Sequence, residues 1–507
     1  MKKCSELFKS QIVLGLSMLF LAYTTAVFAE PMPAKHQDIK KTISFEEMEV
    51  FLKEKSKTPN VTITEAGKSV QGRPLYLVHI NNKKNANPTK IFLFAQMHGN
   101  EVSSKDALLY LAKNYAENPK KLPADVDLWL LPMLNPDGSV KYERRNANNV
   151  DLNRDQKHLT QPESITLNKI VQKLHPDITV DCHEYTRNAP AGYAERGWLR
   201  YPDIMVDVSN SLLLDDRYYN LGLKWIEDLK PTMAKAGHYY ARYYLGKTPP
   251  EGNLRPSNLG AYDGRNLGPL YNGIGFIIES AVRRDVPDPA NDMLAKRVDA
   301  YMTVLTNMIN DKKLHNEVKK LTVENKDPQT PHFIPVTYMW GNAGKQKITK
   351  VEVIDAKTKQ VKFVETANFT TDRVVTESVA TPKAYIIRPV DNTLFTQWLT
   401  NQAIEFTELK NNETFLTEQA IAADVKGPSV HKISSGKRTV TITPAKMREF
   451  SAGSLYVPVE QSGKMRVLHH LEPGLVWSGL FDPRFNPNPF IKLIDKNKVI
   501  PIERVMN

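Results

Sequence analysis

Cysteine is almost absent from this chain of 507 residues, in which only Cys4 and Cys182 occur. Two cysteines cannot supply a disulfide framework. A strong charge of one sign is also lacking, since 68 Lys and Arg residues against 56 Asp and Glu residues leave a formal net charge of +12. Spread over this length, the excess does not indicate nucleic-acid binding, which needs a clustered basic stripe or a motif. The hydrophobic content of 41% and the charged content of 24% exclude a disordered or collagen-like chain.

Long apolar runs are missing after the first thirty residues, so no later segment is long enough to span a bilayer. The N-terminus begins with Lys2 and Lys3, and residues 12–29 are uncharged, largely apolar and end in small residues. This pattern predicts a secretory signal peptide over residues 1–29 and therefore an exported protein, periplasmic or secreted. The alternative is an uncleaved membrane anchor, because the apolar segment is close to the shortest spanning length.

The remaining chain contains alternating strand and helix patterns up to about residue 313. Continuous apolar runs, which are typical of buried parallel strands, occur at residues 91–95, 127–134, 177–182 and 274–278. Helical spacing occurs at residues 44–55, 102–115, 163–174, 219–236 and 291–311. This alternation predicts an α/β fold with a mostly parallel mixed sheet sandwiched by helices.

The pattern changes near residue 314. Residues 314–331 are polar and contain Pro328 and Pro331, so they are interpreted as a linker. Residues 332–507 contain short runs of strand type and are predicted to form one or two β-rich accessory modules. The main domain is then expected to cover residues 30–313.

Three side chains of the predicted main domain form a candidate metal site. His98 and Glu101 directly follow the first buried strand, and His183 follows another. Ligands in open α/β sheets bind at the carboxyl ends of the strands, so these residues are expected to meet. Two imidazoles and one carboxylate are a donor set of catalytic zinc sites, which leave a fourth position open. A surface histidine near a helix N-terminus is the alternative interpretation of a single His-x-x-Glu pair.

Two further segments carry charged side chains at strand ends. Residues 144–154 form a loop rich in Asn and Arg, which is either a solvated turn or a site whose guanidinium groups bind a carboxylate. Glu279 ends the apolar run at residues 274–278, where a carboxylate is seldom placed unless it is paired or functional. The structural alternative is an ion pair of Glu279 with Arg283 or Arg284.

In these motifs the sequence resembles the zinc carboxypeptidase family, of carboxypeptidase A type, over about residues 40–313. The early segment 67–75 is similar to the strand and turn signature of that family. The resemblance implies one zinc ion per chain, with His98 and Glu101 as the first two ligands and His183 as the third.

The same resemblance implies roles for the residues around the metal. Arg144 stands where the family has its oxyanion-stabilising arginine, and Glu279 matches its general base. Asp151 is the expected supporting partner of His98, and Asn153 with Arg154 matches the pair that binds the terminal carboxylate of the substrate.

Residues 257–273 are rich in Gly and Asn and match the family less clearly. Tyr262 lies nine residues before Tyr271 and is carried over as the mobile active-site tyrosine. Arg265 lies in the same segment and is a candidate for binding an acidic side chain or carboxylate of the substrate, with a solvent-facing role as the alternative.

The expected function is that of a zinc-dependent carboxypeptidase, which hydrolyses C-terminal peptide bonds with a metal-activated water and a glutamate base. The expected partner is a peptide or a peptidoglycan stem peptide, with no nucleic acid and no membrane span after cleavage of the signal. Two other functions stay open: a zinc amidohydrolase that deacylates N-acyl amino acids, and a non-catalytic envelope-binding protein on a peptidase scaffold.

Overall fold

The structure is a computed structural model. It describes residues 32–81, 87–187, 192–257, 259–260, 263–326, 328–342, 348–422, 440–475, 480–481 and 488–507. The predicted signal peptide, residues 1–29, and Tyr262 lie outside the described residues.

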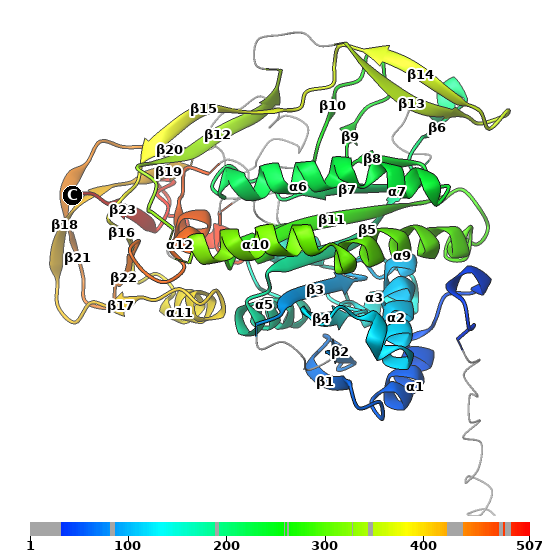
Figure 1. Ribbon diagram of the computed structural model, residues 1–507. Coiled ribbons are helices and arrows are strands. Elements are labelled where there is room, and N and C mark those ends of the chain that lie inside the picture. Colours follow the sequence, from blue (N-terminus) through cyan, green and yellow to red (C-terminus); the bar gives the residue numbers. More distant parts are fainter. Residues whose placement is uncertain are drawn as a thin grey trace, which may run out of the picture.

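A central eight-stranded sheet organises the first part of the chain (Figure 1). Its strands are β1 (Val61–Lys68), β2 (Pro74–Ile80), β3 (Thr89–Ala95), β4 (Val126–Leu131), β5 (Ile178–Thr186), β7 (Ile204–Val208), β8 (Tyr240–Arg242) and β11 (Ile274–Val282). They lie in the order β1-β2-β4-β3-β5-β11-β7-β8. The pairs β4–β3, β3–β5, β5–β11 and β7–β8 are parallel. The pairs β1–β2, β2–β4 and β11–β7 are antiparallel. The predicted mixed, mostly parallel sheet is therefore confirmed.

Helices cover both faces of this sheet. They are α1 (Phe45–Lys55), α2 (Val102–Glu117), α3 (Pro136–Lys141), α4 (Leu152–Asp155), α5 (Pro162–Leu174), α6 (Asp216–Asp228), α7 (Lys230–Lys235), α8 (Leu267–Leu270), α9 (Leu294–Asn310) and α10 (Lys312–Glu324). The larger core lies between the sheet and α1, α2, α6, α9 and α10, and a smaller core joins the other face to α5 and α8. None of the helices in the described part of the chain combines the length and the apolar character needed to cross a membrane.

Local sequence signals explain several helix boundaries. Ser44 caps α1: its hydroxyl accepts a hydrogen bond from the Glu47 amide, and the Glu47 side chain accepts one from the Ser44 amide. The pattern at residues 219–236 predicts one helix, but the structure has α6 and α7 separated at Leu229. Pro231 stands in the first turn of α7, where its missing N–H is tolerated, whereas it could not continue α6.

The rest of the chain is mainly β-structure, as expected. Its elements are β12 (Phe333–Gly341), β13 (Thr349–Asp355), β14 (Val361–Thr366), β15 (Asp372–Ala380), β16 (Ala384–Ile387), β17 (Thr407–Glu408), β18 (Glu413–Glu418), β19 (Ala420–Ala422), β20 (Val440–Ile442), β21 (Lys446–Phe450), β22 (Leu455–Pro458), β23 (Ile502–Val505), α11 (Asn392–Asn401) and α12 (Lys464–Leu471). Six of the strands form an antiparallel sheet in the order β17-β22-β16-β23-β18-β21. The segment from β12 to β23 is called the C-terminal region below.

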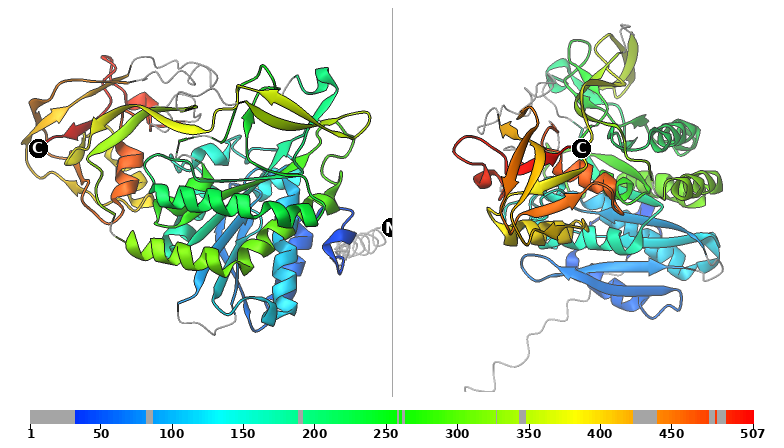
Figure 2. Two further views of the ribbon diagram at one scale, coloured as in Figure 1. Left: turned by 45° about the horizontal axis from the view of Figure 1, so that its top comes forward. Right: turned by 90° about the vertical axis from the view of Figure 1, so that its left-hand side faces the viewer.

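The C-terminal region lies against the first part of the chain, as both views of Figure 2 show. Strand β13 pairs with β6 (Trp198–Arg200), which comes from the first part. Residues of the predicted linker form most of α10, which packs on α6. One apolar core combines Leu213 and Leu259 with side chains of the C-terminal region. The two parts therefore share a continuous packed interface.

Two adjacent histidines of α12 lie within this interface. His469 and His470 are each 2% exposed, and neither ring makes a hydrogen bond to another described residue. Burial is the main cause that lowers the pKa of both rings, to about 3 for His469, and the positive charge of Lys157 adds to the effect. Both histidines are therefore neutral in the folded protein at the pH where a free imidazole takes up a proton.

This pair predicts a loss of stability in mild acid. Below pH 6.5 both rings take up a proton in the unfolded chain but not in the folded chain. Each histidine should therefore lower the free energy of unfolding by about 1.4 kcal/mol for every pH unit below that value. Chemical denaturation at pH 7 and pH 5 measures the difference. A His469→Leu, His470→Leu variant should lose less stability over this range, whereas His332→Asn, at an exposed position, should behave like the wild type. Equal pH dependence in all three proteins would contradict the prediction.

Candidate active site

The three predicted metal ligands come from the carboxyl ends of two neighbouring strands. His98 lies in the loop that follows β3, Glu101 directly precedes α2, and His183 lies in the second half of β5. Strands β3 and β5 are parallel and paired, so the residues that follow them reach the same edge of the sheet. All three side chains are buried, with 1–3% of their surface exposed.

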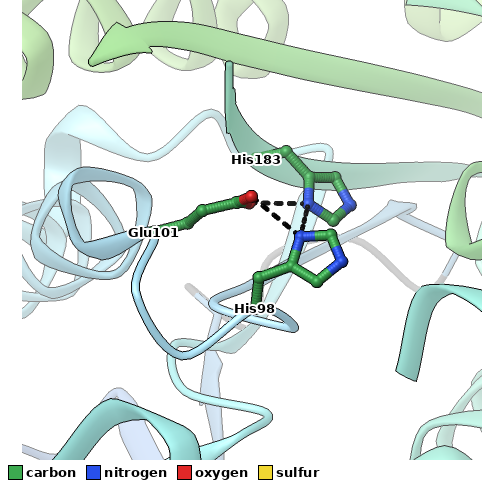
Figure 3. A group of neighbouring side chains, drawn as sticks. All are labelled: His98, Glu101 and His183. Carbon is green, nitrogen blue, oxygen red and sulfur yellow. Dashed lines mark hydrogen bonds and ion pairs between the residues drawn. The ribbon is translucent and has the colours of Figure 1, made fainter. Parts of the chain in front are cut away.

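The three side chains point toward one another (Figure 3). Glu101 Oε1 lies 2.8 Å from His98 Nδ1, and Glu101 Oε2 lies 2.9 Å from His183 Nδ1. The two Nδ1 atoms are 3.1 Å apart. Two nitrogen donors and a carboxylate thus converge on one point.

A carboxylate lies behind each imidazole. Asp151 Oδ1 is 3.1 Å from His98 Nε2, and Asp181 Oδ1 is 2.8 Å from His183 Nε2. For His98 the carboxylate at Nε2 favours the tautomer that is protonated there, so its Nδ1 presents a lone pair to the shared point. For His183, Asp181 places a negative charge close to Nε2. This arrangement fits a zinc ion, which prefers nitrogen and oxygen donors and is commonly supported by carboxylate–histidine pairs.

Asp151 connects three parts of the site, namely His98, Arg144 and the start of α4. As N-cap of α4 it accepts a hydrogen bond from the Asn153 amide, and its Oδ2 accepts one from Arg144 Nη2 at 2.9 Å. Burial opposes the negative charge, but the hydrogen bond to His98 and the charges of Arg144 and Arg154 hold the pKa of Asp151 well below its usual range. The residue therefore stays ionised and fixes the relative positions of these groups.

Arg144 reaches the metal-binding group itself. Its Nη1 lies 3.1 Å from His98 Nδ1 and 3.4 Å from Glu101 Oε1, and its side chain is 43% exposed. The guanidinium thus spans from the buried ligands to solvent, where it can face a bound substrate.

Two glycines let the loops around Arg144 approach closely. A Cβ atom on Gly99 would lie 2.1 Å from the carbonyl carbon of Gly138, and one on Gly138 would lie 2.6 Å from the Arg145 oxygen. The side chain of Asn135 also joins the two loops, since its Nδ2 donates to the carbonyls of Met97 and Arg144. These contacts set the distance between the loop of the ligands and the loop of Arg144.

Glu279 lies beside the metal-binding group. Strands β11 and β5 are parallel, and Glu279 pairs in register with His183, so both side chains point to the same face. Burial raises the pKa of Glu279 to about 7; His183 and Arg144 oppose the shift, and Glu101 and Asp181 add to it.

The alternative ion pair of Glu279 is not formed in the described part of the chain. Arg283 pairs with Asp285 at 3.3 Å, and Arg284 donates to the Asn100 carbonyl and the Tyr142 hydroxyl. Glu279 is therefore a buried carboxyl group in the second half of β11 that neither of these arginines neutralises.

Asn153 and Arg154 lie on α4, close to the third ligand. Asn153 Nδ2 is 3.1 Å from His183 Nε2, and its Oδ1 accepts a hydrogen bond from the Gly264 amide. Arg154 Nη1 donates to the Asn153 carbonyl, and the side chain of Arg154 is partly exposed. The structure thus brings both residues to the rim of the same site.

Arg265, the candidate for substrate specificity, is fully buried. Its Nη2 lies 3.0 Å from Asp263 Oδ2, and its Nη1 lies 4.0 Å from Asp207 Oδ2 and bonds to the Ser257 hydroxyl. Two carboxylates already compensate its charge. The solvent-facing alternative is wrong because the side chain is buried. These contacts suit a residue that fixes the loop around it.

Asp181 is a site residue that the sequence reasoning missed. The signal was available, since residues two apart on a strand share a face and Asp181 precedes His183 by two. Its neighbour Cys182 points into the larger core on the other face, as a buried free thiol.

Replacing Asp181 by asparagine should weaken zinc binding about 10- to 100-fold, because His183 loses the carboxylate that orients it and raises its basicity. Competition with a chromophoric chelator measures the affinity. Asp177→Asn is the matched control, since Asp177 is a buried aspartate at the other end of β5, where it pairs with Lys319. Unchanged affinity in the Asp181 variant would refute its supporting role.

The chain is similar to known carboxypeptidases. Residues 48–191 match the family model described as zinc carboxypeptidase. "Carboxypeptidase 2" of Trichophyton rubrum is 27% identical over 249 residues, which cover 46% of this chain and 46% of the relative. "Carboxypeptidase D" of Homo sapiens is 35% identical over 150 residues, covering 24% of this chain and 11% of the relative. The chain thus spans less than half of these relatives. A metallo-carboxypeptidase structure from Burkholderia cenocepacia has a TM-score of 0.40 and 19% identity, covering 52% of this chain and 68% of that chain.

Proposed function

We propose that this chain, with its zinc carboxypeptidase match over residues 48–191, is a zinc-dependent carboxypeptidase that removes C-terminal residues from peptides. The observation that carries the proposal is the convergence of His98, Glu101 and His183 beside Glu279. We propose residues 30–313 as the catalytic domain and 332–507 as an accessory region. Residues 314–331 are proposed as the linker between them, with its first part folded as most of α10.

His98, Glu101 and His183 would hold the zinc ion. When bound, zinc supplies a Lewis acid that polarises the scissile carbonyl and lowers the pKa of a water molecule. Asp151 keeps the imidazole of His98 in the tautomer that this binding requires, and Asp181 places a negative charge close to His183.

Glu279 is proposed as the general base. Its carboxylate accepts a proton from the attacking water and later delivers it to the leaving amine. The buried setting that raises its pKa to about 7 suits both steps, since a group that titrates near neutral pH can accept and release a proton.

Arg144 and the α4 residues are proposed to bind the substrate. The guanidinium of Arg144 stabilises the negative charge that develops on the carbonyl oxygen. Asn153 and Arg154 hold the terminal carboxylate of the substrate by charge-assisted hydrogen bonds. Asp151 supports this arrangement, because it contacts Arg144 and caps the helix that carries Asn153. Tyr262 stays the proposed mobile tyrosine, whereas for Arg265 we now propose a role in fixing its loop.

We propose that the protein is exported and that its substrates are peptides of the envelope or the medium, including peptidoglycan stem peptides. The acidic character of stem peptides suits a chain in which Lys and Arg outnumber Asp and Glu.

Product mass spectrometry on a mixed peptide library, with stem peptides included, tests the proposed function. Stepwise loss of C-terminal residues, abolished by C-terminal amidation, is the expected result. Hydrolysis of N-acyl amino acids without peptide cleavage would support the amidohydrolase instead. Absence of zinc and of any turnover under zinc-replete conditions would support the binding protein.

A further inference from the structure

The segment that follows the proposed carboxylate anchor is polar but buried. Its three residues lie in no helix or strand, yet only 1–3% of the surface of each is exposed; they are Gln156, Lys157 and His158. Polar side chains are seldom buried in this way unless their groups are bonded. Residues 156–158 are called the anchor-following segment below, because they come after Asn153 and Arg154, the proposed anchor of the substrate carboxylate.

The Gln156 side chain bonds locally to Leu152 and Ser164, whereas the C-terminal region bonds to Lys157 and His158. Trp398 Nε1 and Gln402 Nε2 donate to the Lys157 carbonyl at 2.8 and 2.9 Å. The His158 ring contacts the Leu480 carbonyl at 3.0 Å. Helix α11 and its C-cap thus hold the backbone of the anchor-following segment from one side, as the proximity of α11 and α5 in Figure 1 illustrates.

Lys157 makes the most direct connection. Its ammonium group donates to the His469 carbonyl at 2.7 Å. This carbonyl lies in the last turn of α12, where a helix leaves carbonyl groups without partners and favours positive charge. Because a buried ammonium is costly unless it is bonded, the position of Lys157 is fixed by α12.

Helix α4 has little stability of its own. It consists of the residues Leu152–Asp155, about one turn, which is too short to persist without support at its ends. Asp151 caps its start and also contacts His98. Lys157, three residues after Arg154, ties its other end to the C-terminal region.

We propose that the C-terminal region completes the substrate-binding site by fixing α4, with Lys157 as the positioning residue for Arg154. This inference rests on the proposed function, because it assigns Arg154 to the substrate carboxylate. Lys157 does not touch the substrate; it acts through the helix that carries Asn153 and Arg154. The C-terminal region is then required for substrate affinity rather than for metal binding or proton transfer.

The test compares Lys157→Met with the wild-type full chain. Methionine keeps an unbranched apolar side chain but removes the ammonium. We expect KM for a peptide with a free C-terminal carboxylate to rise about 10-fold or more, with kcat within about twofold and the zinc content unchanged, because misplacement of a binding group costs binding. Arg388→Met is the control: it removes a cation that pairs with Glu503 of β23 in the C-terminal sheet.

Hydrogen–deuterium exchange over residues 150–161 gives a readout that is independent of turnover. Exchange should increase in Lys157→Met and stay unchanged in Arg388→Met. If Lys157→Met does not fold, Trp398→Phe removes only the donor to the Lys157 carbonyl and should raise both exchange and KM.

Three results would overturn the inference: unchanged KM and exchange in the Lys157 and Trp398 variants, an equal rise of KM in Arg388→Met, or a fall of kcat without a rise of KM. If the wild type cleaved no peptide at all, the proposed function would fail. In that case hydrogen–deuterium exchange would still test the inference: an unchanged rate over residues 150–161 in Lys157→Met would show that Lys157 does not fix α4.

Discussion

Replacing Glu279 by glutamine should lower kcat about 1,000-fold and leave the zinc content at one ion per chain. The amide keeps the size of the side chain but cannot accept the proton of the attacking water, and the loss of a general base typically costs two to four orders of magnitude. The zinc content should persist because Glu279 is not among the three converging ligands. Steady-state kinetics and metal analysis of the same preparation measure both quantities.

Glu163→Gln is the matched control for this variant. Glu163 is also a fully buried glutamate whose pKa is raised by burial, but it accepts hydrogen bonds from Val70 and Asn146. Its neutral replacement should keep turnover within a fewfold of the wild type. Undiminished hydrolysis by Glu279→Gln, or an equal loss in both variants, would remove Glu279 from the role of base.

Removing zinc with a chelator should abolish peptide hydrolysis and lower the melting temperature, and one equivalent of zinc should restore both. The site brings two imidazole nitrogens within 3.1 Å of each other beside a buried carboxylate, an arrangement that a cation stabilises. A ligand present at 1,000 times its Kd stabilises the folded state by about 4 kcal/mol. Activity assays and thermal unfolding of metal-free and reloaded protein measure the effect.

Substitutions separate the specific site from adventitious zinc binding. His183→Ala should not regain activity when zinc is added back. His175→Asn should behave like the wild type, since His175 is exposed at the end of α5 and its positive φ of 43° is tolerated by asparagine. Full activity of the metal-free wild type would contradict the assignment of a catalytic metal.

The sequence predicts the central sheet and the convergence of the three predicted metal ligands, because both depend on local patterns of apolar and polar residues. Apolar runs mark β3, β5 and β11, and parallel neighbours place His98, His183 and Glu279 at the same edge. The motif residues therefore fall together once the sheet order is known. Strand alternation also places Asp181 on the same face of β5 as His183.

Long-range contacts could not be predicted in this way. The bond of Lys157 to His469 joins residues 312 positions apart, and neither residue belongs to a periodic pattern that points to the other. The buried state of Arg265 depends on Asp207, which lies on a strand that the sequence reasoning did not identify. Such contacts arise from tertiary packing, for which local propensity holds no signal.

Strand β23 has a consequence for the order of events during synthesis. It lies between β16 and β18 in the C-terminal sheet, although it follows every other strand in the chain. The sheet can close only after residues 502–505 are available, and α11 and α12 pack in the same core as Ile502. If the proposed role of the C-terminal region in fixing α4 holds, α4 is fixed only after β23 has been synthesised and has entered the sheet.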